Sequence, residues 1–417
     1  MSAGRLSDSL APVRRLDGAL LRLALSMLGH PPVSIRLWNG EPFGAPEQAA
    51  VARVKVHDPA LPRAFMAAPE SALADAYVEG RIDVEGDLVG LVEALFRARN
   101  QVPGWARLLS RAATWRPRRN GRQQARPNSD SHYERDADFW GLWLDEQLVY
   151  SCAYYPTPEA SLEEAQLAKL ELVCRKLALE PGERVADIGC GWGALALHMA
   201  EHYGVRVDAY GLTSSQLETA RGKAEARGLA DRVRFIQADF RDVGGPYDAV
   251  ACLGMIEHVG RDQYQSLAVS LDRCLAPGGR ALLQFIGHVR PMPVNPWIVA
   301  NIFPGGYLPA LSEILPALES REFALVDVEN LRRHYVKTLG EWLARFEKAE
   351  SQVAARYGER FVRTWRLYLA SSIAAFRSGS CQLYQLLLAR ADDQGLPWTR
   401  RERAGSAAAS DRLPPVV

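Results

Sequence analysis

Three glycines at alternate positions, directly after a short apolar run, constrain the fold of this chain more than any other feature. They lie in VADIGCGWGAL, residues 185–195. The apolar run predicts a strand that ends near Asp187, and ALALHMAEHY after the glycines predicts a helix. Glycine permits a tight turn and lets a ligand lie against the main chain. G-x-G-x-G alone is weak evidence and lacks the spacing of a dinucleotide motif, but its position between strand and helix favours a ligand-binding turn.

Strand-like and helix-like segments alternate from about Glu159 to Gly287. Apolar runs predict strands in RVADIG, VRVDAYGL, VRFIQAD, YDAVACLG and RALLQFIG. A repeat of 3.6 residues predicts helices in SLEEAQLAKLELVCRKLAL, ALALHMAEHY, SSQLETARGKAEARG and QYQSLAVSLDRCL. A Pro-Gly-Gly turn is expected before the last strand, and WRLYLASSIAAFRSGSCQLYQLLLA is expected to add a core helix and a final strand. This order predicts a Rossmann-like, doubly wound α/β sheet.

The length of 417 residues suffices for two or three domains. Short strands (VSIRLWNG, VARVKVHD) and helical stretches (ESALADAYVEG, DLVGLVEALFRARN) before Asn100 predict a smaller N-terminal α+β domain. We therefore expect an N-terminal domain over residues 1–100, a basic linker over 101–130, the α/β domain over 131–398 and a disordered tail over 399–417.

Positive charge is concentrated between Arg97 and Arg126, although the net charge of the whole chain is only +1. This stretch has nine arginines, no acidic residue, Trp105 and Trp115. It is either a solvated linker or a segment that an anionic membrane surface attracts, at ~1 kcal/mol for each cation near the surface. One basic run is weak evidence for nucleic acid, and we expect no nucleic-acid partner.

The helix expected at residues 14–29 carries arginines among leucines, so it either rests on a bilayer or belongs to the N-terminal core. No apolar run reaches the ~18–20 residues of a membrane span, and the N-terminus lacks the pattern of a signal peptide. Six cysteines without a C-x-x-C pair favour a reducing cytosol. We expect a cytoplasmic protein that is peripheral at the inner face of the plasma membrane.

Several motifs carry a resemblance to known enzymes. D-x-G-x-G-x-G at a strand end resembles the first motif of S-adenosylmethionine-dependent methyltransferases, and LAPGGRALLQ resembles a later one. YSCAYY, EEAQLAKL, DIGCGWG, GMIEHVG and IFPGGYLP, in this order, resemble the cyclopropane-fatty-acid synthase family, which includes the mycolic acid cyclopropane synthases. The resemblance runs from about Leu142 to Leu388, and ALADAYVEGRIDVEGDL is similar to the N-terminal part of the two-domain phospholipid enzymes. It implies a class I methyltransferase fold and S-adenosylmethionine as cofactor.

The reaction that this resemblance implies is methyl transfer to the cis double bond of an unsaturated acyl chain in a membrane phospholipid. The π-electrons of the double bond attack the methyl group, and a base then removes a proton. Water has to stay out because it would capture the cation, so the site should be apolar and aromatic with one small polar cluster. The sequence leaves two products open, a cyclopropane and a methylene-branched chain.

In the family the base is a bicarbonate ion held by a small set of residues. The matching positions here are Cys152, Glu257, Ile286 and Tyr335, while the histidine position of the family is occupied by Gln284. A glutamine donates a hydrogen bond but cannot carry positive charge or relay a proton. Either the substitution is tolerated, or the binding of bicarbonate is weakened or replaced.

Glu146 lies six residues before Cys152, in WLDEQLVYSC. One hypothesis is that its carboxylate reaches the polar cluster and takes over the role of bicarbonate. A solvated acid on a helix face is the more common situation for such a residue.

The cofactor site that the resemblance implies is formed by the segment before the first helix, the glycine turn and the ends of the next two strands. Its residues are Tyr150, Ser151, Asp187, Gly189, Gly191, Thr213, Gln216, Ala238 and Asp239. The backbone at residues 238–239 should meet the adenine, whereas no acidic residue ends VDAYGL to bind the ribose. The histidines show no metal-ligand spacing, and we expect no metal.

Two other functions use the same features. A methyltransferase acting on RNA or a small molecule would share the cofactor motifs, and the arginine run would suit RNA. A lipid-binding module without activity would keep the fold, but the intact glycine motif and Glu257 disfavour it. The sequence does not determine the oligomeric state, and a homodimer is compatible with it.

Overall fold

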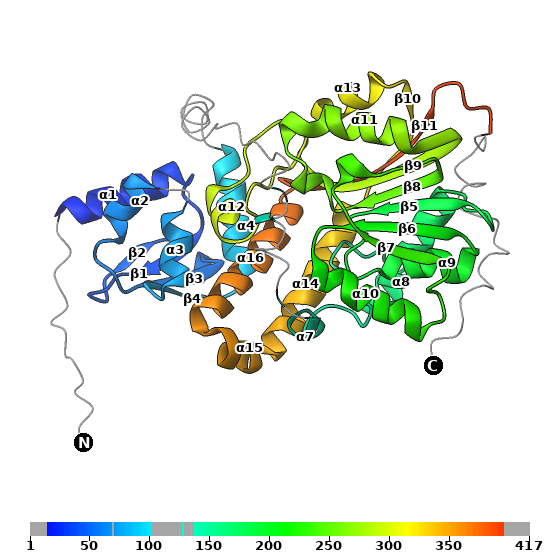
Figure 1. The fold of residues 1–417 in the computed structure, drawn as a ribbon. Coiled ribbons are helices and arrows are strands. Elements are labelled where there is room, and N and C mark those ends of the chain that lie inside the picture. The colour runs from blue at the N-terminus through cyan, green and yellow to red at the C-terminus, as the bar shows by residue number, and fades with distance from the viewer. Residues whose placement is uncertain are drawn as a thin grey trace. The chain divides into compact units, whose positions relative to one another are not determined.

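The fold is shown in Figure 1 as a computed structural model, which describes residues 15–68, 71–101, 125, 127–128, 135 and 137–395. Contacts divide the chain into two compact units. The first unit combines Met1–Trp115 with Asn295–Ile302 and Glu347–Ser380, and the second unit contains the remainder. The expected domain boundaries at residues 100 and 130 remain predictions. Most of the expected basic linker (102–124) and the expected tail (399–417) lie outside the described residues.

A seven-stranded sheet forms the centre of the second unit. Its strands are β5 (Arg184–Ile188), β6 (Arg206–Gly211), β7 (Val233–Gln237), β8 (Tyr247–Leu253), β9 (Leu275–Gly287), β10 (Phe323–Asn330) and β11 (Gln382–Arg390). They are ordered β10-β11-β9-β8-β5-β6-β7, with β9 to β7 parallel and β11 antiparallel to both of its neighbours. The chain order reverses at β5, because β6 lies on one side of it and β8 on the other. Ligands bind at such a reversal in open α/β sheets.

Helices cover both faces of this sheet (Figure 1). The helices of the second unit are α7 (Ala137–Gly141), α8 (Leu162–Lys176), α9 (Ala194–Tyr203), α10 (Ser214–Ala226), α11 (Tyr264–Cys274), α13 (Leu311–Glu319) and most of α14 (Arg332–Lys348), with short 3-10 helices η2 (Phe240–Asp242), η3 (Ile256–His258) and η4 (Arg261–Gln263). α8, α9 and α10 share one apolar cluster with the sheet, and α11 and α13 share another. Val185 belongs to the first cluster and Ala186 to the second, as the alternation of side chains along a strand requires.

The strands and helices expected between residues 159 and 287 are confirmed, with one difference in β9. Tyr247 pairs with Leu275 and Ala249 with Arg280, so the Pro-Gly-Gly segment bulges out of a strand that begins before it. β10 lies outside the expected strands. It is an edge strand of mostly half-exposed residues, in which acidic and apolar side chains are mixed.

The first unit is an α+β structure around a four-stranded sheet. The strands β1 (Val33–Arg36), β2 (Pro42–Gly44), β3 (Ala52–Val56) and β4 (Ile82–Gly86) are ordered β2-β1-β3-β4. Only β1 and β3 pair in parallel. The helices are α1 (Arg15–Met27), α2 (Leu61–Ala67), α3 (Ala72–Val78), α4 (Leu88–Gln101), α12 (Pro296–Asn301), α15 (Glu350–Tyr357) and α16 (Glu359–Arg377), with the 3-10 helix η1 (Glu47–Ala49).

The helix α16 belongs to the first unit, although the sequence pattern places it with the α/β sheet. It packs against α3 and α4 and buries Trp365, Leu369 and Ile373. The expected final strand, in contrast, does join the sheet of the second unit as β11. Among the described residues, no helix is long and apolar enough to cross a bilayer.

Replacing Arg363 with Met should destabilise the first unit by about 2–4 kcal/mol. The Arg363 guanidinium donates to the carbonyls of Tyr77 (2.6 Å) and Ile82 (2.7 Å) and to Asp83 Oδ1 (3.2 Å). The variant leaves these acceptors without their charged donor. Urea unfolding followed by tryptophan fluorescence measures the loss, and the exposed Arg360→Met on the same helix should stay within about 0.5 kcal/mol of wild type. Equal stability of the two variants would contradict the assignment of α16 to this core.

Candidate active site

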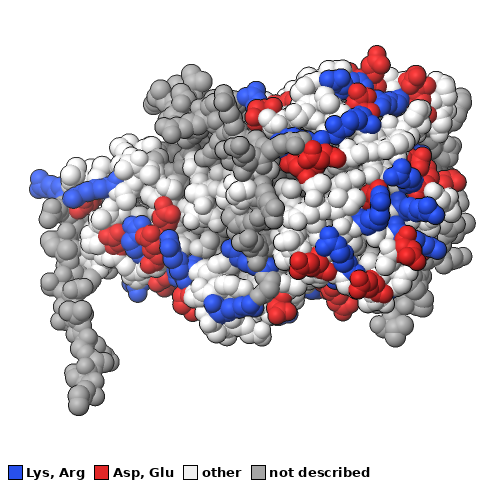
Figure 2. Space-filling model, viewed as in Figure 1, with Lys and Arg blue, Asp and Glu red and all other residues white. Residues whose placement is uncertain are grey.

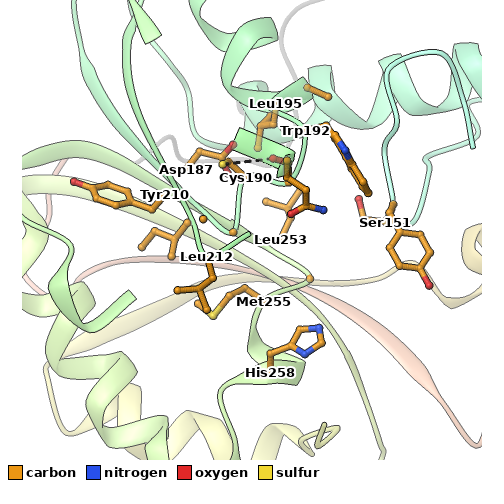
Figure 3. Close-up of a pocket in the computed structure, with 18 of the residues that line it drawn as sticks. Ser151, Asp187, Cys190, Trp192, Leu195, Tyr210, Leu212, Leu253, Met255 and His258 are labelled. Carbon is orange, nitrogen blue, oxygen red and sulfur yellow. Dashed lines mark hydrogen bonds between the residues drawn. The ribbon is translucent and has the colours of Figure 1, made fainter. Parts of the chain in front are cut away.

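A pocket lies at the carboxyl ends of β5, β6 and β8 in the second unit (Figure 3). Most of the expected cofactor residues line it: Tyr150, Ser151, Asp187, Gly189, Gly191, Gln216, Ala238 and Asp239. Thr213, which is buried at the N-cap of α10, is not one of the described residues that line the pocket. The sheet thus gathers segments that are distant in the sequence into one site.

The glycine turn between β5 and α9 forms one wall of the pocket. The φ angles of Gly189, Gly191 and Gly193 are 88°, 54° and 84°. A Cβ at Gly189 would lie 2.9 Å from the Met255 side chain, and one at Gly193 would lie 2.8 Å from the Phe235 ring. No atom lies within 4 Å of a Cβ at Gly191. Gly189 and Gly193 therefore permit close packing, and Gly191 leaves open main chain for a ligand.

Asp187 is a buried carboxylate at the end of β5. Its side chain is 2% exposed, and its Oδ2 atom has no hydrogen-bond partner among the described residues. Burial raises the pKa of Asp187 to about 7, although the nearby charge of Lys169 lowers it. A buried carboxylate oxygen without a partner is costly, and a cationic group of a ligand would satisfy it.

The segment that carries Tyr150 and Ser151 is fixed by α8. Gln166 Nε2 donates to the carbonyls of Val149 (3.2 Å) and Ser151 (2.9 Å). Lys169 Nζ donates to Ser151 Oγ at 3.3 Å. These hydrogen bonds hold Tyr150 and Ser151 at the pocket that the glycine turn also lines.

Asp239 follows β7 at the other end of the pocket and begins η2. Its carboxylate accepts hydrogen bonds from the backbone N–H of Arg241 (3.0 Å) and from Arg241 Nη1 (2.8 Å). Because this carboxylate is engaged with Arg241, the backbone at residues 238–239 is the group that remains for the adenine of the cofactor.

Glu257 and Ile286 are the two expected catalytic residues that a hydrogen bond joins directly. The Ile286 N–H donates to Glu257 Oε1 at 2.7 Å, whereas Oε2 is buried without a hydrogen-bond partner in the described part of the chain. Burial raises the pKa of Glu257 to about 7, against the lowering effect of the Ile286 N–H. A carboxylate with a pKa near neutrality and one free oxygen is suited to accept a proton.

Cys152 and Tyr335 are both buried. Tyr335 belongs to α14, and the segment that carries Cys152 is hydrogen-bonded to the same helix. The Cys152 thiol donates to the Ala153 carbonyl at 3.2 Å, and the Ala153 N–H donates to Thr338 Oγ1 at 3.1 Å. Burial raises the pKa of Cys152, so this thiol stays protonated and serves as a hydrogen-bond donor rather than a nucleophile. Tyr335 lies one turn before Thr338 and packs edge-on against Trp342.

Gln284 is 1% exposed and belongs to a chain of buried amides. Its Oε1 accepts from Gln385 Nε2 at 2.7 Å, and Gln385 Oε1 accepts from Lys176 Nζ at 2.6 Å. Lys176 also pairs with Glu329. Because the amide oxygen of Gln284 is occupied by β11, the group that remains for a bound anion is its NH₂.

Glu146 is exposed, which contradicts the hypothesis that its carboxylate replaces bicarbonate in the cluster. The neighbouring Asp145 is the buried acid, 2% exposed, and accepts hydrogen bonds from the backbone N–H of Gln147 (3.1 Å) and Val149 (2.8 Å). Asp145 stabilises the turn from inside, and the adjacent side chain consequently points to solvent.

Two further features of the site are absent from the sequence expectations. Lys169 lines the pocket at 2% exposure, and burial lowers its pKa to about 8. Its signal in the sequence is a lysine on the apolar face of the helix, among buried residues such as Ala165 and Leu170. His258 also lines the pocket, and burial lowers its pKa to about 4, so its ring is neutral.

An aromatic cluster backs the site. Trp140 packs against Tyr150 and Trp192 with ring centroids 4.7 and 5.3 Å apart, and Trp342 packs against Tyr150 at 5.3 Å. Tyr150 and Trp192 line the pocket. The cluster keeps water away from this side and positions Tyr150.

The arrangement fits S-adenosylmethionine. The open main chain at Gly191, the unpartnered Asp187 oxygen and the backbone after β7 suit, respectively, the sulfur-bearing chain, the α-ammonium and the adenine. In the described part of the chain, no group of three or more His, Cys, Asp or Glu residues is placed to hold a metal.

The known proteins to which this chain is similar include fatty acid methyltransferases and cyclopropane synthases. The sequence profile of mycolic acid cyclopropane synthetase matches residues 120–386, and that of a domain of unknown function matches residues 20–103. A probable fatty acid methyltransferase of Pseudomonas putida is 34% identical over 394 residues, 89% of this chain and 96% of the relative. The cyclopropane-fatty-acyl-phospholipid synthase of Escherichia coli K12 is 39% identical over 266 residues, 64% of this chain and 68% of the relative. The crystal structure of mycolic acid cyclopropane synthase CmaA1 complexed with SAH and CTAB has a TM-score of 0.60 at 30% identity, over 63% of this chain and 97% of that one.

Replacing Glu257 with Gln should make the protein more stable relative to wild type, and this difference in stability should grow as the pH rises from about 5 to about 8. The native pKa near 7 lies above the ordinary value of 4.5, so wild type loses stability as the pH rises through this interval and Glu257 ionises while buried. The full effect is about 3 kcal/mol. Melting temperatures measured across this pH range should diverge between variant and wild type. The exposed Glu146→Gln is the control, and a constant difference for Glu257→Gln would contradict the prediction.

Proposed function

The chain belongs to the mycolic acid cyclopropane synthetase family, and on this premise we propose that it methylates the cis double bond of an unsaturated acyl chain in a membrane phospholipid. Membership makes it an S-adenosylmethionine-dependent lipid methyltransferase. The observation that carries the proposal is the similarity to a probable fatty acid methyltransferase over 89% of the chain. The phospholipid substrate is supported by the similarity to the Escherichia coli enzyme.

The chemistry requires an electrophilic methyl group, a dry site and a base. S-adenosylmethionine supplies the methyl group on a sulfonium when it is bound. The aromatic cluster around Tyr150 and Trp192 excludes water from the cation that forms on the acyl chain, and aromatic faces stabilise positive charge. The proton then leaves to Glu257 Oε2, or to a bicarbonate ion held beside it. Loss of that proton from the new methyl group closes a cyclopropane, whereas a methylene branch first requires a hydride shift along the chain.

Gln284 supports a role for Glu257 as the base itself. An imidazole at this position could carry the positive charge that helps to hold bicarbonate, whereas the NH₂ of Gln284 is only a neutral donor. Glu257 is already buried next to the Ile286 N–H, and its other oxygen has no hydrogen-bond partner among the residues that the structure describes. The carboxylate can therefore take the proton without a bound anion.

Incubation with S-adenosylmethionine and a dioleoyl phospholipid should yield acyl chains that are one CH₂ heavier, and Glu257→Gln should reduce the rate by about 10²–10⁴-fold. Mass spectrometry measures the transfer, and proton NMR of the released acids separates cyclopropane from methylene. Activity should persist when bicarbonate is removed, whereas Gln284→His should make the rate respond to added bicarbonate. Methyl transfer to RNA or to a small molecule but not to lipid would refute the proposed substrate.

We also propose that the enzyme is peripheral on an anionic membrane and approaches it with the outer face of α1. The inner face of this helix buries Leu21 and Ala24 in the first unit. Leu16, Leu23 and Met27, which are 59%, 47% and 43% exposed, share another face of the helix. Figure 2 shows basic side chains over the region of α1, and Arg15 and Arg22 of this helix are exposed. Exposed apolar side chains with flanking arginines suit the interface of an anionic bilayer.

Leu16→Ser with Leu23→Ser should weaken binding to vesicles that contain anionic phospholipid by about 10–100-fold. Sedimentation measures the bound fraction, and rising salt should weaken the binding of wild type. The control pair Val51→Ser with Leu325→Ser removes exposed apolar side chains elsewhere and should bind as wild type does. Normal binding by the α1 pair would exclude this helix as the docking surface.

A further inference from the structure

Lys169 is a cation with an unusual environment for its charge. It projects from α8 into the protein at 2% exposure, and its ammonium donates to Ser151 Oγ at 3.3 Å. Ser151 and Asp187, which line the pocket together with Lys169, come from different elements around it (Figure 3). An ammonium that is buried beside a neutral hydroxyl carries a large desolvation cost.

The nearby acids compensate for this charge only at a distance. Asp145 and Asp187 act on Lys169 through their electrostatic fields. Asp145 directs its carboxylate at backbone N–H groups instead. Of the cationic side chains among the described lining residues, Arg241 is already paired with the carboxylate of Asp239. Lys169 is therefore the lining cation that still lacks a carboxylate.

We propose that Lys169 is the positioning residue for the α-carboxylate of S-adenosylmethionine and acts through the hydroxyl of Ser151. The inference rests on the proposed function for the identity of the cofactor. It adds a division of charge within the pocket, with Lys169 and Ser151 facing the carboxylate and Asp187 facing the α-ammonium.

The hydrogen bond from Lys169 determines how Ser151 can act. A serine hydroxyl has one hydrogen to donate, and its oxygen accepts from neighbouring donors. Because Lys169 donates to Ser151 Oγ, the hydroxyl hydrogen remains available for a ligand. The ammonium also polarises the O–H group, which strengthens the bond that it donates to an anion. Lys169 thus converts Ser151 into a carboxylate-selective donor.

The decisive experiment compares two ligands by calorimetry, S-adenosylhomocysteine and its analogue without the α-carboxylate. Wild type should prefer S-adenosylhomocysteine, and Lys169→Met should reduce that preference by about 10–100-fold while affinity for the analogue changes little. Ser151→Ala should lose the same preference, and the double variant should lose no more than either single variant. Lys176→Met, on the same helix but bonded to Gln385 and Glu329, is the matched control and should bind both ligands as wild type does.

Equal weakening of both ligands by Lys169→Met would overturn the proposal and make Lys169 a packing residue. Additive losses in the double variant would overturn the route through Ser151. If wild type binds S-adenosylhomocysteine with the expected preference but transfers no methyl group to lipid, the proposed substrate fails while the role of Lys169 stands. If wild type binds neither ligand, both proposals fail.

Discussion

The parallel pairing of β5 with β6 and β8 is the constraint on which the site depends. Parallel strands place their carboxyl ends at one edge of a sheet, so the turns that follow them meet around a single space. The glycine turn, the backbone after β7 and the loop that carries Glu257 reach that space for this reason. The segment with Tyr150 and Ser151 comes from outside the sheet and is held at the same edge by α8.

Burial then gives these groups their chemistry. Asp187 and Glu257 have pKa values raised to about 7, and Lys169 has one lowered to about 8, because desolvation penalises the charged form of each. Each of them also has hydrogen-bonding capacity that the protein uses incompletely, and this favours ligands that bring the complementary charge. Groups of this kind cost folding stability and cluster at functional sites.

The parts of the fold that follow from local pattern were predictable, and the parts that depend on distant partners were not. The glycine turn, the strand before it and the helix after it are contiguous in the sequence, over Arg184–Tyr203. The apolar face of α16 shows that the helix is buried, but it does not show that α3 and α4 cover it. The choice between Asp145 and Glu146 depends on a turn whose hydrogen bonds the sequence does not display. Gln284 was recognised as a departure from the family, whereas its partner Gln385 lies on a strand a hundred residues away.

The interleaving of the two units has a consequence for biosynthesis. The described helices α15 and α16 of the first unit follow most of the second unit in the sequence and precede its strand β11. As the chain leaves the ribosome, the amino-terminal sheet is made first, yet its helices α3 and α4 have to wait for α16 before their apolar surface is covered. The first unit therefore stays incomplete until α16 is made, and the second unit stays incomplete until β11, which lies between β9 and β10, is made after it. A truncated product that ends before residue 359 would expose the apolar surface of α3 and α4 to aggregation. No single cut in the chain can release either unit intact, because each is threaded through the other in sequence.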